Sequence, residues 1–244
     1  MNDSSHPPAS THDADPLTVF DKDKFESDLR SMTRIVLRPI GSPLPVGFFT
    51  VAIDNVVVSS LQWGIIPASA DRAVGLIVFT AFVVQTIVGI FALLARDSAA
   101  GTLMLSFATT WLADALVYGL HPSGAAQALG IFSITFAVFV AIMLTSALPK
   151  RALAAVLTAA VPRFLISGIA DITGSHAVAQ AAAVLGYLLA AVAMYTAFAL
   201  LWEDSRGREL LPVGRRGPAL RATTGGLADG LRDIERQAGV RRTL

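Results

Sequence analysis

The charged residues of this 244-residue chain are concentrated at its two ends. Residues 43–202 contain ten charged residues in 160 positions, whereas the flanking segments 1–42 and 203–244 together contain 27 in 84. Soluble domains carry about 25% charged residues. The uneven distribution therefore excludes an ordinary soluble globule, a disordered chain and a nucleic-acid-binding protein, and indicates a membrane protein with two polar ends.

The central segment consists of six apolar stretches separated by short polar breaks. They cover roughly 44–66, 73–95, 101–120, 127–148, 152–174 and 177–201. A helix needs about 20 residues to cross a hydrocarbon layer of about 30 Å, and the alternation typical of membrane strands is missing. The sequence predicts an all-α integral membrane bundle of six transmembrane helices, in which the short breaks make consecutive helices antiparallel neighbours.

The polar ends predict three regions: an N-terminal tail (1–42), the membrane domain (43–202) and a basic C-terminal tail (203–244). Of the 19 Lys and Arg residues, 17 lie in the tails or in the second and fourth breaks, and one, Arg72, lies in the other breaks. By the positive-inside rule, both termini should be cytosolic. Residues 20–38 are expected to form either a short interfacial helix or a partly ordered tail. Residues 219–244 are expected to be either a weak amphipathic helix or disordered.

Four charged residues fall within the predicted spans: Asp54, Asp114, Arg163 and Asp171. Charges inside a membrane are costly and usually face the bundle interior. Residues four apart share a helix face, and this spacing forms three polar stripes, with Gln85 as an isolated polar residue in the second span. The stripes are Thr50–Asp54, Ser106–Thr110–Asp114–Tyr118 and Arg163–Ser167–Asp171.

Two interpretations of these charges remain open, and both can hold. In the structural one, Arg163 pairs with Asp54 or Asp114 and locks the bundle. In the functional one, the stripes line a solute path in which Arg163 attracts an anion and a carboxylate takes up protons. Pro162 is expected to kink the fifth span or open its hydrogen-bond ladder.

The chain lacks the motifs of an enzyme or a metal protein. It has no Gly-x-Ser-x-Gly, no His-Glu-x-x-His, no phosphate-binding glycine loop and no cysteine. His121 and His176 fall in predicted outer breaks and are typical of surface residues. We therefore expect no enzymatic activity, no cofactor and no metal site.

The entry to the first span resembles a known family signature. Ser42-Pro43-Leu44-Pro45-Val46-Gly47-Phe48 is similar to the Asn-Pro-Ala-Pro-Leu-Gly-Leu motif of the acetate uptake transporter family. Three further elements agree in order and spacing: Gln85 with Gly89, the segment 170–177, and the segment 206–214, which is similar to Phe-Gly-Arg-x-x-Leu-Pro-x-Gly. The resemblance covers about residues 42–214.

The resemblance implies a six-helix subunit with a central path, assembled as a homo-hexamer in the cell membrane. It implies transport of small carboxylates, chiefly acetate and in some members succinate, by proton-coupled carriers or channels. The double-proline entry would supply groups near the substrate and stay partly unwound. The predicted substrate path comprises Ser42, Pro43, Pro45, Phe48, Val51, Asp54, Gln85, Thr110, Asp114, Arg163 and Asp171.

The chain also departs from the family pattern. Ser42 replaces the signature Asn and Leu44 the small Ala, while Val51 and Thr110 stand at the positions of two aromatic residues that narrow the path. Asp171 replaces an Asn, and Asp54, Asp114 and Arg163 are not part of the pattern. These changes predict a narrow point that is wider or differently built.

Three hypotheses follow from the sequence. The first is a transporter or channel for small carboxylates, with protons as the coupled partner. The second is a channel for small neutral solutes such as urea or short amides. The predicted spans contain three carboxylates and one arginine, and this balance fits neutral solutes slightly better than anions. The third is a membrane scaffold or sensor whose polar tails bind partners.

Overall fold

The computed structural model describes residues 41–95 and 97–206, and these residues form a bundle of α-helices. The helices are α2 (Leu44–Trp63), α3 (Asp71–Leu94), α4 (Ser98–Leu120), α5 (Ala125–Ala147), α6 (Arg151–Thr173) and α7 (His176–Arg206), with a short 3₁₀ turn, η1 (Ala68–Ala70), before α3. Six helices in this part of the chain are long and apolar enough to cross a membrane. The predicted fold class is confirmed.

The predictions for the tails fall largely outside the described residues. This applies to the possible helices at 20–38 and 219–244 and to most of the segment 206–214. The last helix, however, continues to Arg206, past the predicted end of the membrane domain at residue 202.

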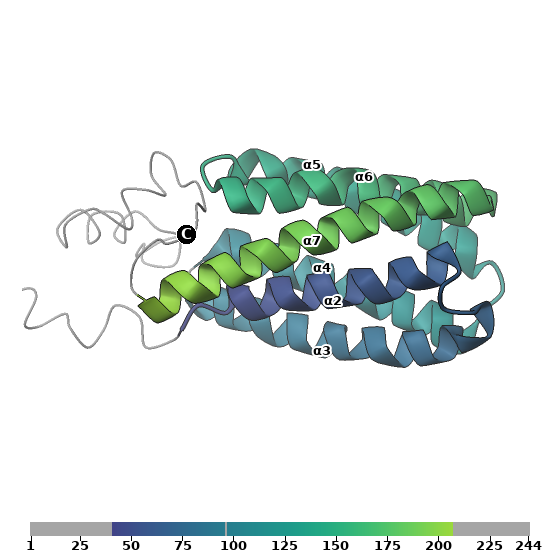
Figure 1. Cartoon of the computed structure of the whole chain (residues 1–244), viewed down its shortest axis with the longest axis horizontal. Helices are drawn as coiled ribbons and strands as arrows, with labels where there is room; N and C mark the ends of the chain where they lie inside the picture. The colour runs from purple at the N-terminus through teal and green to yellow at the C-terminus, as the bar shows by residue number, and fades with distance from the viewer. Residues whose placement is uncertain (1–40, 96, 207–244) are drawn as a thin grey trace, which may run out of the picture. The chain divides into compact units, whose positions relative to one another are not determined.

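The helices pack as a closed ring in sequence order. Each helix contacts the next along the chain, and α7 returns to pack against α2. Figure 1 shows the helices running alternately up and down, so that the start of α2 and the end of α7 lie at the same end of the bundle. We call this the terminal end, and the opposite one the distal end.

Proline and glycine set the ends of α2. Pro45 lies in its first turn, where a missing N–H removes no helical hydrogen bond. The expectation of a partly unwound entry is therefore wrong, because the helix is regular from Leu44. It ends at Trp63 and is followed by Gly64, whose φ of 92° is accessible to a residue without Cβ.

Small residues allow close helix packing. The face of α7 turned into the bundle carries Ala182, Ala183, Gly186, Ala190, Ala193 and Ala197, all buried. Between α5 and α6 the backbones meet at Gly130 and Gly168, where a Cβ on Gly168 would lie 2.5 Å from the Gly130 carbonyl oxygen. Close van der Waals packing of this kind stabilises helix association in membranes, because the hydrophobic effect does not drive helices together in lipid. The bundle also includes Pro162 inside α6 without a break in the helix.

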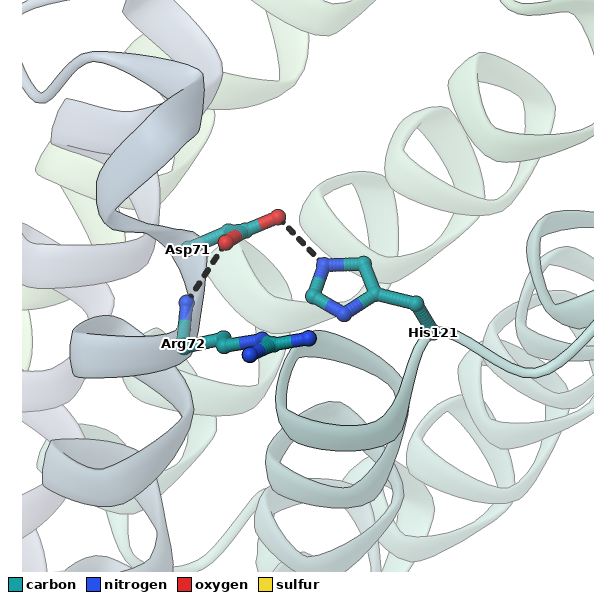
Figure 2. Close-up of polar contacts among 3 residues, drawn as sticks. All are labelled: Asp71, Arg72 and His121. Atoms are coloured by element: carbon teal, nitrogen blue, oxygen red, sulfur yellow. Dashed lines mark hydrogen bonds and ion pairs between the residues drawn. The ribbon is translucent and has the colours of Figure 1, made fainter.

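Two ion pairs connect the loops at opposite ends of the bundle. At the distal end, His121 Nε2 lies 2.5 Å from Asp71 Oδ2, and Asp71 Oδ1 accepts a hydrogen bond from the backbone N–H of Arg72. Figure 2 shows this pair joining the start of α3 to the end of α4. At the terminal end, Lys150 Nζ lies 3.1 Å from Asp97 Oδ2. Partly exposed pairs of this kind contribute at most about 1 kcal/mol.

The contact between α5 and α6 can be tested with Gly168→Ala. The new Cβ would overlap the Gly130 carbonyl and sit 2.7 Å from Ile134 Cγ1, so we expect unfolding free energy to fall by about 1–3 kcal/mol. Thermal unfolding in detergent measures the change. Gly119→Ala is the matched control, because nothing lies within 4 Å of its Cβ position. Equal stability of the two variants would contradict the close packing.

Candidate functional site

A cavity lies inside the ring, between α2, α4, α5 and α6. Ten of its thirteen lining residues carry a polar group on the side chain, which is unusual for the interior of a membrane bundle. The lining residues are Asn55, Val58, Gln62, Thr110, Trp111, Asp114, Tyr118, Phe132, Ser133, Arg163, Phe164, Ser167 and Asp171.

Helical periodicity explains why these residues meet. Thr110, Asp114 and Tyr118 follow each other at intervals of four on α4, and Arg163, Ser167 and Asp171 do so on α6. Each set therefore forms one stripe along its helix. Two of the three stripes predicted from the sequence thus border the same cavity, whereas the stripe of Thr50 and Asp54 does not.

Arg163 is the most constrained group of the site. Its side chain is only 5% exposed, and its Nε donates a long hydrogen bond of 3.4 Å to Asn55 Oδ1. Its Nη1 is buried and has no hydrogen-bond partner. Within residues 41–95 and 97–206, no carboxylate oxygen lies within 4.0 Å of the guanidinium. Of the two interpretations left open by the sequence, the structural one, a salt bridge of Arg163 with Asp54 or Asp114, is not found among these residues.

The neighbours of Arg163 hold it in place from two sides. Asn55 donates through Nδ2 to the Val51 carbonyl at 2.8 Å, which leaves its Oδ1 to accept from Arg163. On the other side, Gly186 of α7 leaves room for the guanidinium, because a Cβ there would lie 2.8 Å from Arg163 Nε and would overlap Ser59 Oγ. The position of the cation thus depends on α2, α6 and α7 together.

Trp111 supplies a second donor without a partner. Its side chain is 2% exposed, it borders the same cavity, and its Nε1–H makes no hydrogen bond. Buried donors are nearly always paired with protein or water. Two unpaired donors beside one cavity therefore favour an acceptor bound between them, either water or the oxygen atoms of a solute.

The distal half of the cavity carries the carboxylates. Gln62 Nε2 donates to Ser167 Oγ at 3.0 Å and so joins α2 to α6. Asp114 and Asp171 line the cavity near this bond and interact electrostatically with Arg163. In the part of the chain that the structure describes, neither carboxyl group has a hydrogen-bond or ion-pair partner.

Aromatic side chains close the cavity toward the terminal end. Phe164 borders the cavity and packs edge-to-face on Phe136 and Phe107, with ring centroids 4.7 Å and 5.7 Å away. All three rings are buried. The rings of α4, α5 and α6 thus fill the interior next to the cavity, and Val51 lies in the apolar core.

The predicted path residues divide into two groups. Thr110, Asp114, Arg163 and Asp171 line the cavity, whereas the remaining seven do not. Phe48 and Val51 lie in the apolar core, Pro45 is buried in the first turn of α2, and Ser42 and Pro43 precede that helix. Gln85 donates to the Gly47 carbonyl at 3.1 Å and joins α3 to α2. Asp54 is 4% exposed but does not border the cavity.

Several residues of the site were not predicted from the sequence. Asn55, Gln62, Trp111 and Ser133 line the cavity but were not predicted. The seven-residue spacing of Asn55 and Gln62, which places both on one face of α2, was a usable signal. Trp111 had none, because a tryptophan in an apolar helix reads as a core residue.

Comparisons with known proteins identify the family. The GPR1/FUN34/yaaH family matches residues 25–213. This chain belongs to that family. The resemblance inferred from the proline motif and the six spans is thereby confirmed, and the six long apolar helices make the chain a multi-pass membrane protein. No curated protein matches the chain.

The solved structure of the bacterial acetate channel SatP has the same fold. The two share 23% sequence identity with a TM-score of 0.65, and the likeness covers 72% of this chain and 99% of the channel. The ring of six helices is thus an arrangement already seen in an experimental structure.

The placement of Arg163 can be tested with Gly186→Ala. The added methyl group would overlap both Ser59 Oγ and Arg163 Nε, and both side chains would have to move away from α7. We therefore expect the free energy of unfolding to fall by about 1–3 kcal/mol. Thermal unfolding of Gly186→Ala, Ser59→Ala and the double variant measures the coupling. Removing Ser59 Oγ should recover part of the loss, and strictly additive losses would contradict the packing.

Proposed function

We propose that this protein carries small carboxylates, acetate or a similar monocarboxylate and also succinate, across the cell membrane, with proton-linked uptake. The observation that carries the proposal is the buried, unpaired Arg163 beside a polar cavity. Membership in the GPR1/FUN34/yaaH family and the fold shared with an acetate channel support it.

The donors of the cavity suit a carboxylate. The free Nη1 of Arg163 and the Nε1–H of Trp111 have no acceptor of their own. A carboxylate has two oxygens and can accept from both, and such charge-assisted hydrogen bonds are shorter and stronger than neutral ones. In a low-dielectric interior, the single guanidinium also attracts an anion over a longer distance than it would in water.

The acidic side chains provide the proton link. Asp114 and Asp171 stand between Arg163 and the distal end, without a partner in the described part of the chain. A carboxylate anion that passes them is repelled unless one of them binds a proton or the substrate enters together with a proton. Uptake should therefore depend on the proton gradient.

The aromatic cluster provides the barrier. Phe107, Phe136 and Phe164 fill the interior on the terminal side of the cavity. A solute that reaches Arg163 from the distal end must displace these rings to go further. Gating by an apolar constriction of this kind is known in channels.

The remaining parts of the proposal come from the positive-inside rule and from the family resemblance. We place both termini in the cytosol, which makes the terminal end of the bundle cytosolic and the polar cavity accessible from outside. We further propose assembly as a homo-hexamer, with one path in each subunit.

A channel for small neutral solutes is the second candidate. Two carboxylates and one guanidinium line the cavity, and this balance favours neutral solutes such as urea more than it favours anions. Swelling of proteoliposomes in urea or acetamide measures this activity directly.

The role of Arg163 can be tested with Arg163→Gln. Hydrogen bonds to charged groups contribute roughly 1.5–3 kcal/mol, so uptake of labelled acetate into proteoliposomes should fall about 10- to 100-fold. Arg151→Gln is the matched control, because it removes an exposed arginine at the start of the same helix. Uptake by the parent protein should also rise when the outside is made acidic.

The contrary results are equally specific. Acetate uptake that is unchanged in Arg163→Gln would refute the role of Arg163 in binding the carboxylate. Uptake that does not change with the pH gradient would refute the proton link. Swelling in urea without uptake of acetate, propionate or succinate would instead support the neutral-solute channel.

A further inference from the structure

The charges of the cavity are arranged in order along its length. On α6, Arg163 and Asp171 are eight residues apart, which corresponds to about 12 Å along the helix. Asp114 on α4 lies between them, because α4 and α6 run in the same direction and Asp114 and Ser167 are both the seventeenth residue of their helices. The cavity thus has a positive group at its inner end and two negative groups toward its distal end.

A simple monocarboxylate satisfies only part of this arrangement. Its oxygens pair with Arg163, but Asp114 and Asp171 are left without a positive partner from the protein, since the described residues that line the cavity include one cation only. Ionised groups within a membrane are normally paired. A solute that carries a positive group beside its carboxylate would supply the missing partner.

We infer that the cavity accepts small zwitterions, that is, short amino carboxylates whose carboxylate binds Arg163 and whose ammonium group faces Asp114 and Asp171. This inference rests on the proposed function, because it assigns the substrate class of the same site. The unpaired Nη1 of Arg163 in a side chain only 5% exposed is the independent sign that a ligand belongs there.

The spacing of the charged groups along α4 and α6 agrees with the length of such a ligand, and the enclosed space, about 20 Å³, must widen to admit it. With one or two carbons between its charged groups, the ammonium nitrogen lies about 3–5 Å from the carboxylate oxygens, and hydrogen bonds of about 2.9 Å extend this at each end. The solute then spans roughly 9–11 Å between protein atoms, which lies between the rise of four residues along a stripe, about 6 Å, and that of eight residues, about 12 Å.

The other polar groups of the cavity are placed to solvate the ligand. Thr110 shares the level of Arg163, as each is the thirteenth residue of its helix, and Trp111 follows directly. Ser167, Gln62 and Ser133 surround the middle, where Gln62 Oε1 is buried without a partner and can accept from an ammonium group. A carboxylate without an ammonium group has no hydrogen to donate to the Gln62 oxygen.

The zwitterion also changes the expected coupling. An ammonium group brings its own positive charge to the acidic half of the cavity and takes the place of the proton that a monocarboxylate needs. Uptake of an amino carboxylate should therefore depend less on the pH gradient than uptake of acetate does.

The test compares solutes that differ only in the ammonium group. Glycine is paired with propionate and β-alanine with butyrate, because each pair exchanges an ammonium for a methyl group. We expect glycine or β-alanine to enter proteoliposomes of the full chain, to compete with labelled acetate, and to exceed the paired fatty acid in uptake. The sensitivity to a pH gradient should be lower for the amino carboxylate.

Three variants locate the ammonium site. Asp114→Asn and Asp171→Asn should each lower the ratio of β-alanine to butyrate uptake about tenfold, as expected for loss of a charged hydrogen-bond partner. Asp204→Asn removes an exposed carboxylate at the end of α7 and should leave the ratio unchanged. Because the ratio is taken within one preparation, it does not depend on how much protein folds, and the competition experiment needs no variant.

Three results would overturn the inference. Acetate uptake without entry of, or competition by, either amino carboxylate would refute it and leave the proposed function standing. Entry of the amino carboxylates with a ratio that neither Asn variant alters would refute the role of the two aspartates. If no carboxylate of any kind is carried, the proposed function fails together with the inference.

Discussion

The structure depends on a guanidinium group that is buried near the middle of α6 without a carboxylate to neutralise it. Arg163 keeps one bond to Asn55, and Gly186 leaves the space that its side chain occupies. A charged arginine at the centre of a membrane helix costs about 2.5–3.5 kcal/mol on insertion scales. A structural arginine would offset this cost with a salt bridge, and the aspartates of the spans are available for one. Their separation from Arg163 is the reason why we propose the cavity as a binding site and not as a structural ion pair.

The ring of helices makes this arrangement possible. Close contacts at Gly130, Gly168 and Gly186 let α5, α6 and α7 approach one another, so that the polar stripes of α4 and α6 face inward while apolar residues face lipid. The ends are fastened by the pairs His121–Asp71 and Lys150–Asp97. Polar groups are therefore concentrated on the distal side of the interior and aromatic rings on the terminal side. In the proposed function, this asymmetry provides a solute with a binding site and then a barrier.

Much of this architecture could be predicted from the sequence, because the physics of a bilayer restricts it. The six spans follow from length and hydropathy, and the stripes through Asp114 and Arg163 follow from helical spacing. The rotation of α2 was predicted wrongly, because this helix carries polar residues on more than one face and the stripe of Thr50 and Asp54 was chosen over the face of Asn55 and Gln62. Phe48 and Val51 were expected at the path, yet the cavity face is that of Asn55 and Gln62. The hydrogen-bond partner of Arg163 could not be predicted either. Depth in the membrane alone places Asp54, Asp114 and Asn55 at comparable levels.

Water access to the cavity is the most direct test of the central claim, and the absence of cysteine in the chain makes it simple. Single cysteines are introduced at Ser133 and Ser167, which line the cavity, and at Ile131 and Leu165, which are exposed on the outer surface of the bundle. A membrane-impermeant, water-soluble thiol reagent is then applied to the protein in liposomes. The account predicts that the two cavity positions react and that acetate slows their modification, while the two outer positions stay unmodified. Cavity positions as inert as Leu165→Cys would show that the polar groups are sealed from water and would contradict the account.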